Sequence, residues 1–124
     1  MSLEPKRRLV VVDDEPSARL IVQKVLERAG YQVTAFGLGE EAVLYAEKNP
    51  VDLLIVDCNL PKMSGPQLIA KLRQTLPRLP VVLMTAGVQS SIEGQVVQAF
   101  LAKPFKQLRS VKEAVREAFD RSEP

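Results

Sequence analysis

The 124-residue sequence contains no histidine, no tryptophan and only one cysteine. Without histidine, the chain cannot supply a Ser-His-Asp or Cys-His catalytic site, a histidine ligand for zinc, or a phosphohistidine. The single cysteine, Cys58, excludes an intrachain disulfide and suits a reducing cytosol. Since no histidine is present to activate its thiolate, we expect Cys58 to be a small buried apolar residue. The side chains that remain available for chemistry are carboxylates, hydroxyls and lysines. Carboxylate and hydroxyl oxygens are hard ligands, which favour Mg²⁺, Mn²⁺ or Ca²⁺.

Long apolar runs and a strong net charge are also missing. No run is long enough to span a bilayer and no signal-peptide pattern is present, so we expect a cytoplasmic protein without membrane contact. The net charge of +2 gives no reason to expect direct nucleic-acid binding. A hydrophobic fraction of 46% and a charged fraction of 26% predict one packed domain. We expect that domain to span residues 8–124 after a short leader, residues 1–7.

Short apolar runs alternate with helical patterns along the chain. The runs predict strands over residues 8–12, 31–36, 52–56, 81–84 and 99–102. Apolar residues at helical spacing predict helices over residues 16–29, 40–48, 67–76 and 107–121, and a short or frayed helix within 88–98. This alternation is typical of an α/β, doubly wound, five-stranded parallel sheet with helices on both faces.

Reactive polar residues stand at the ends of four of these five strands. Asp13 and Asp14 follow the first strand, Asp57 the third, Thr85 the fourth and Lys103 the fifth. Because the carboxyl ends of parallel strands meet at one edge, where ligands bind in open α/β sheets, these side chains are expected to converge there.

Each of these residues also has an ordinary structural interpretation. The acids of Asp13-Asp14-Glu15 could cap the first helix, and Asp57 could form an Asx turn. Thr85 could be a strand or turn residue and Lys103 a solvated lysine. Their joint occurrence at the strand ends favours a site. Glu15 is assigned to the start of the first helix.

The combination suggests phosphoryl-transfer chemistry. Mg²⁺ binds through one or two carboxylates and retains waters. An aspartate carboxylate can attack phosphorus and form an aspartyl phosphate. A metal ion and a lysine offset the charge on the phosphoryl oxygens, to which a threonine hydroxyl can donate.

Four segments, VVVDDEP, IVDCNLPKMSG, MTAG and FLAKPF, resemble receiver domains of two-component response regulators. The resemblance implies the flavodoxin-like fold with strand order 2-1-3-4-5. It also implies that Asp57 is the phosphoacceptor, that Thr85 and Lys103 contact the phosphoryl group, and that the Lys103–Pro104 bond is cis. The implied ligands of Mg²⁺, or of Mn²⁺ in its place, are Asp13, Asp14, Asp57 and the backbone carbonyl of Asn59. Thr85 and Phe100 occupy the positions of the conformational switch, although Phe100 could instead be a core strand residue.

The resemblance further implies a regulatory domain rather than an enzyme. Its partner would be a histidine kinase or a histidine phosphotransfer protein, and it could dimerise. The segment between Thr85 and Lys103 is shorter than usual in the family and lacks the common Ala-Gly-Ala turn. LMTAG and AFLAKPF are most similar to receiver domains of hybrid sensor kinases or single-domain regulators.

A flavodoxin-like enzyme or ligand-binding domain that uses Mg²⁺ and the acids on a small substrate is the alternative. A haloacid-dehalogenase-type phosphatase also forms an aspartyl phosphate, but needs a second acid two residues after the nucleophile, where this chain has Asn59. A flavin-binding protein would need a Ser/Thr/Gly loop after the first strand, where this chain has acids.

Overall fold

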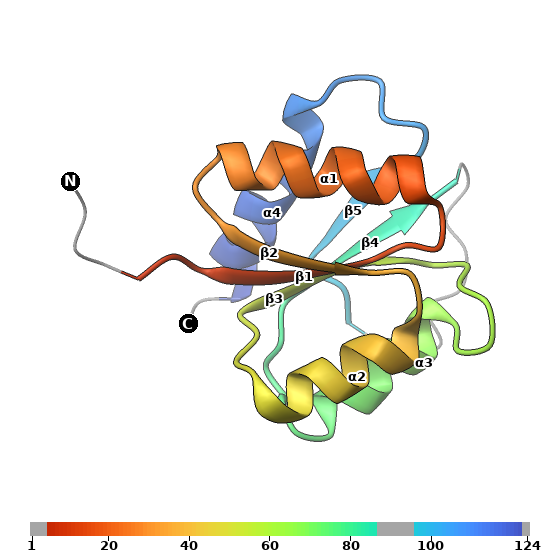
Figure 1. The fold of residues 1–124 in the computed structure, drawn as a ribbon. Helices are drawn as coiled ribbons and strands as arrows, with labels where there is room; N and C mark the ends of the chain where they lie inside the picture. Colours follow the sequence, from red (N-terminus) through yellow and green to blue (C-terminus); the bar gives the residue numbers. More distant parts are fainter. Residues whose placement is uncertain (1–4, 87–95, 123–124) are drawn as a thin grey trace.

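The computed structural model describes residues 5–86 and 96–122, which form alternating strands and helices (Figure 1). The strands are β1 (Arg8–Val12), β2 (Gln32–Phe36), β3 (Leu53–Asp57), β4 (Val81–Thr85) and β5 (Ala99–Ala102). The helices are α1 (Pro16–Arg28), α2 (Gly39–Lys48), α3 (Gly65–Arg73) and α4 (Arg109–Ser122).

The five strands form one parallel sheet in the order β2-β1-β3-β4-β5. Helices α1 and α4 cover one face of this sheet, and α2 and α3 cover the other (Figure 1). The predicted doubly wound fold with strand order 2-1-3-4-5 is therefore confirmed. The carboxyl ends of all five strands lie at the same edge of the sheet. The inner strands β1, β3 and β4 end at the middle of this edge.

The three central strands are apolar because both of their faces are buried. Along β1, Leu9 and Val11 pack on the side of α1 and α4, whereas Val10 and Val12 pack on the side of α2 and α3. Strands β3 and β4 are buried at every position. This two-sided packing makes a close-packed support for the polar residues at the strand ends.

Some predicted boundaries were wrong by one to three residues. Strands β3 and β4 each extend one residue further than predicted, so Asp57 and Thr85 are the last residues of their strands. Helix α3 begins at Gly65 rather than at residue 67, because Ser64 and Gln67 form a reciprocal capping box ahead of it. Helix α3 also ends at Arg73, before the predicted end at residue 76.

Ile21 and Leu108, two apolar residues within the predicted helices, are exposed. Leu108 is 55% exposed because α4 begins only at Arg109, which leaves Leu108 in the preceding loop. Ile21 is also exposed, while Ala18, Val22 and Leu26 form the buried stripe of α1. Cys58 is buried, as predicted.

The predicted fourth helix, within residues 88–98, lies largely outside the described residues, and residues 96–98 are not helical. Among the described helices, none has both the length and the apolar character needed to cross a membrane.

Candidate functional site

Lys103 occupies the centre of the polar edge, immediately after β5. Its Nζ lies 2.8 Å from Oδ2 of Asp13 and 3.0 Å from Oδ2 of Asp57. Asp13 follows β1 and is fully buried, whereas Asp57 ends β3 and is nearly so. The sheet thus brings together residues that are 90 and 46 positions away from Lys103 in the sequence.

The two buried carboxylates are held in the same way. In each, Oδ1 accepts a hydrogen bond from the amide two residues further on: Glu15 N–H for Asp13 and Asn59 N–H for Asp57, both at 3.0 Å. Each Oδ2 is left for Lys103. The turn interpretation of Asp57 is therefore correct, and the same turn orients its carboxylate toward the Lys103 ammonium.

Burial and charge oppose one another at Lys103. Burial favours the neutral amine, but the hydrogen bonds and Coulomb attraction of Asp13 and Asp57 outweigh it and raise the pKa of Lys103. Lys103 is consequently an ammonium ion at neutral pH. Burial raises the pKa of the Asp13 carboxyl, and the hydrogen bonds from Lys103 and the Glu15 amide only partly offset this.

Asp14 completes a group of three acids suited to a hard divalent cation. One carboxylate oxygen from each of Asp13, Asp14 and Asp57 lies within 4.8 Å of the others. Asp14 is exposed, and its carboxylate makes no hydrogen bond or ion pair with another described residue. Oxygen donors of this kind are those that Mg²⁺ and Mn²⁺ prefer.

Thr85 and Asn59 border the same group. Thr85 is buried at the end of β4, and its main-chain oxygen accepts a hydrogen bond of 2.8 Å from Lys103 N–H. Asn59 is exposed and touches the group through its amide, which donates to Asp57. The Lys103–Pro104 peptide bond is cis, the isomer that the resemblance implies.

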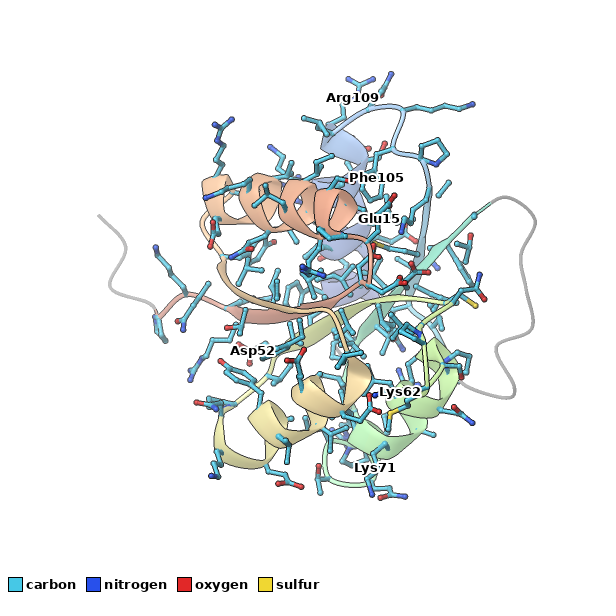
Figure 2. All side chains as sticks on the ribbon, turned by 45° about the vertical axis from the view of Figure 1, so that its right-hand side comes forward. Glu15, Asp52, Lys62, Lys71, Phe105 and Arg109 are labelled. Carbon is cyan, nitrogen blue, oxygen red and sulfur yellow. The ribbon has the colours of Figure 1, made fainter. Side chains whose placement is uncertain are left out.

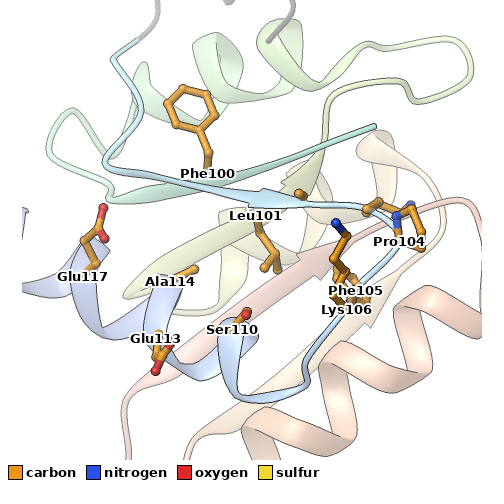
Figure 3. A pocket seen from close by; sticks show the side chains of 11 residues that line it. Phe100, Leu101, Pro104, Phe105, Lys106, Ser110, Glu113, Ala114 and Glu117 are labelled. Atoms are coloured by element: carbon orange, nitrogen blue, oxygen red, sulfur yellow. The ribbon is translucent and has the colours of Figure 1, made fainter. Parts of the chain in front are cut away.

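Phe100 lies apart from this polar group, on the edge strand β5. Its side chain is 45% exposed, so the interpretation as a core residue was wrong. The reason is the alternation of β5, in which Ala99 and Leu101 are buried and Phe100 and Ala102 are exposed. Figure 3 shows Phe100 and Leu101 on opposite faces, beside a hollow of about 590 Å³ that β5, the following loop and α4 line.

The sequence interpretation missed three contributors to the site. Glu15 does precede α1 as expected, but its side chain makes no capping bond and instead places Oε1 3.6 Å from Lys103 Nζ. It also lines, together with Phe105, a hollow of about 260 Å³ beside Lys103. Glu15 and Phe105 are labelled in Figure 2. Arg19 donates to the main-chain oxygen of Asp13 at 2.8 Å, and Gly65 packs directly on the main chain of Asp57 and Cys58.

Of these three, only Gly65 left a signal in the sequence. A glycine before a proline and after a capping serine is typical of a helix start, and such a glycine often marks a close approach of main chains. The contacts of Glu15 and Arg19 depend on long side chains that reach between elements.

Known proteins share this fold and this sequence pattern. The family model described as "Response regulator receiver domain" matches residues 9–116. The chain belongs to the response regulator receiver domain family. The receiver domain is the regulatory, phosphate-accepting part of two-component response regulators, and this favours the signalling hypothesis over the enzyme alternative.

Curated relatives and solved structures agree with the family assignment. The receiver domain is 36% identical over 121 residues to the alkaline phosphatase synthesis transcriptional regulatory protein PhoP of Bacillus subtilis, covering 94% of this chain and 50% of that protein. It is 33% identical over 125 residues to response regulator GtcR of Aneurinibacillus migulanus, covering 95% and 51%. The chain thus spans about half the length of these two relatives.

Among solved structures, the chemotaxis response regulator CheY4 of Vibrio cholerae matches with a TM-score of 0.81 and 26% identity. This match covers 92% of this chain and 99% of that chain.

Proposed function

We propose that Asp57 of this receiver domain accepts a phosphoryl group from a phosphohistidine of a partner protein. The observation that carries the proposal is the position of the Lys103 ammonium, 3.0 Å from Asp57 and 2.8 Å from Asp13, with the Asp14 carboxylate beside them. Asp57 offers an oxygen nucleophile, and Lys103 offers a fixed positive charge where phosphoryl oxygens gather. Thr85 offers a hydroxyl at the end of the neighbouring strand.

The phosphoryl donor must be another molecule, because this chain contains no histidine. In the transfer, an Asp57 carboxylate oxygen forms a bond to phosphorus while the bond from phosphorus to the donor's imidazole nitrogen breaks. The electron pair of the broken bond returns to the imidazole. Lys103 then exchanges part of its contact with the Asp57 carboxylate for the new phosphoryl oxygens. A histidine kinase or a histidine phosphotransfer protein has the required chemistry.

We also propose that the three acids and the Asn59 carbonyl hold Mg²⁺, or Mn²⁺ in its place. The donor set fits, because Asp14 is exposed and unpaired among the described residues, while Asp57 lies next to it with one oxygen turned toward Lys103. A bound divalent ion would offset charge on the phosphoryl oxygens. The Asp13 side chain is fully buried, whereas 12% of the Asp57 side chain is exposed, so we assign Asp13 a role through a bridging water.

The proposed response is a shift between two packings that involves Thr85 and Phe100. The exposed ring of Phe100 has no hydroxyl, so burial of its apolar surface would be the driving force for an inward position. The function is assigned to the receiver domain alone, over residues 8–124. A cytoplasmic location stays a prediction.

Incubation with Mg²⁺ and acetyl phosphate, followed by intact-mass measurement, tests the assignment of Asp57. We expect the wild-type protein to gain one phosphoryl group and the Asp57→Asn variant to gain none. Asp120→Asn is the matched control, because Asp120 is exposed on α4, outside the site, and that variant should react like the wild type. An unmodified wild-type protein, or an adduct that survives Asp57→Asn, would refute the proposal.

A further inference from the structure

Both main-chain polar groups of Asp13 are held by other elements. The amide of Asp13 donates to the carbonyl of Phe36 at the end of β2, at 3.1 Å. The carbonyl of Asp13 accepts from Nη1 of Arg19, in α1, at 2.8 Å. Since the carboxylate is also bonded at both oxygens, every polar atom of Asp13 has a partner.

The Arg19 guanidinium lies against the turn between β2 and α2. A Cβ atom added to Gly37 would lie 3.0 Å from Nη1 and 3.8 Å from Cζ of Arg19. Contacts of 3.0 Å are tighter than carbon and nitrogen atoms normally make, so a Cβ atom at this position would shift the guanidinium by a few tenths of an ångström. Gly37 does not have a positive φ angle, so its backbone conformation does not require glycine. What the missing side chain provides is space for the Arg19 guanidinium.

We propose that Arg19 is a positioning residue for the metal-binding acids and that Gly37 is the seat of its guanidinium. The carbonyl that Arg19 holds belongs to the peptide group joining Asp13 to Asp14. Asp14 has no side-chain partner among the described residues, so the orientation of this peptide group governs where its carboxylate points. A ligand held in place before the ion arrives loses less conformational entropy on binding.

Charge and position give opposite expectations for Arg19. Near three carboxylates, the positive charge of Arg19 by itself repels a divalent cation. A purely electrostatic role therefore predicts that removing the charge strengthens Mg²⁺ binding. A positioning role predicts the reverse, because the hydrogen bond to the Asp13 carbonyl is lost. The sign of the change thus separates the two roles.

The inference rests on the proposed Mg²⁺ site, so it is tested by the affinity for Mg²⁺ itself, measured by isothermal titration calorimetry on folded protein. Changes in partners that orient metal ligands commonly weaken metal binding by tenfold or more, so we expect Arg19→Gln to weaken it about tenfold. Arg19→Lys, which keeps the charge but not the planar group, should fall between Arg19→Gln and the wild type. Gly37→Ala, which keeps the arginine but moves it, should also weaken binding.

Two controls make the measurement decisive. Arg28→Gln removes an exposed positive charge from the end of the same helix and should leave the affinity unchanged. Gly37→Ala made in the Arg19→Gln background should have no further effect, because Gly37 acts through Arg19 in this proposal. Thermal unfolding of each variant shows separately whether the substitution destabilises the fold.

Unchanged or tighter Mg²⁺ binding by Arg19→Gln would overturn the inference. A variant whose unfolding temperature falls while its Mg²⁺ affinity is unchanged would overturn it as well. Equal weakening by Gly37→Ala in both backgrounds would overturn the role of Gly37 as the seat. A wild-type protein that binds no Mg²⁺ would instead refute the proposed metal site, an outcome that the wild-type titration reveals by itself.

Discussion

At the scale of single residues, Lys103 has two opposite effects. Only 15% of its side chain is exposed, and it neutralises two carboxylates that would otherwise repel each other. The same ammonium competes with any divalent cation for the oxygens of Asp13 and Asp57. We therefore expect Lys103 to stabilise the protein when no metal is bound and to weaken the proposed metal binding.

A Lys103→Met substitution separates these two effects. Removing one partner from a buried ion pair commonly costs about 3 kcal/mol or more, so we expect the free energy of unfolding without Mg²⁺ to fall by about 3 kcal/mol. We expect Mg²⁺ to bind more tightly to this variant and to restore part of the loss. Urea unfolding with and without Mg²⁺ measures both, with the exposed Lys106→Met as the control. An equal loss of stability under both conditions would contradict the competition.

The contacts of Lys103 with Asp13 and Asp57 also make the free energy of unfolding depend on pH. The pKa of Lys103 is raised above the ordinary 10.5, because its two carboxylate partners outweigh burial. A group whose folded pKa is raised contributes stability that is fully present below its unfolded pKa and is lost as the pH rises through the folded value. The stability difference between wild type and Lys103→Met should therefore be fully present at neutral pH and decline only above about pH 10.5. Urea unfolding repeated between neutral and strongly alkaline pH tests this, and a decline already near neutral pH would contradict it.

At the scale of elements, the start of α3 lies against the end of β3, the strand that carries Asp57. A Cβ atom at Gly65 would lie 2.5 Å from the main-chain oxygen of Asp57 and 3.0 Å from Cα of Cys58. Gly65 N–H donates to the carbonyl of Cys58 at 3.1 Å. Helix α3 thus begins in direct main-chain contact with the end of β3, and no flexible side chain can yield there.

Gly65→Ala should therefore push α3 away from Asp57. Overpacking costs about 1–3 kcal/mol, and we expect that loss together with slower phosphorylation of Asp57 by acetyl phosphate. Ser64→Ala is the neighbouring control: it removes the cap of α3 and costs about 1 kcal/mol, but leaves the contact with Asp57 intact. If both variants lost stability and reacted at the wild-type rate, the contact would have no bearing on the site.

The elements also show why the sequence predicted the site better than its surroundings. Asp57, Thr85 and Lys103 were predictable because strand ends in a parallel sheet share one edge, and apolar runs mark those ends. The start of α3 is marked in the sequence by Ser64-Gly65-Pro66, but apolar spacing alone places it two residues too late. Apolar spacing likewise does not report that α4 begins only at Arg109, which leaves Leu108 exposed. The hydrogen bond of Arg19 to Asp13 depends on the rotamer of a long side chain, which no periodicity reports.

At the scale of the whole molecule, the site joins the ends of four strands and the start of α1, so its occupancy is coupled to global folding. Residues from β1, β3 and the segment after β5 must all be in place before Asp13, Asp57 and Lys103 can meet. An unfolded chain separates these residues and binds Mg²⁺ weakly. Binding to the folded state alone should consequently appear as stability of the entire domain.

We expect the free energy of unfolding to rise with Mg²⁺ concentration by about 1.4 kcal/mol for each tenfold increase above the dissociation constant, as one site requires. Asp14→Ala should remove most of this dependence while changing the stability of the metal-free protein little, because Asp14 is exposed and unpaired among the described residues. Ca²⁺, which is larger and prefers more ligands, should stabilise the protein less than Mg²⁺ at equal concentration. Urea unfolding across a Mg²⁺ series measures the slope. A slope that Asp14→Ala leaves unchanged would place the ion elsewhere, and Asp13 and Asp57 would then hold Lys103 rather than a metal ion.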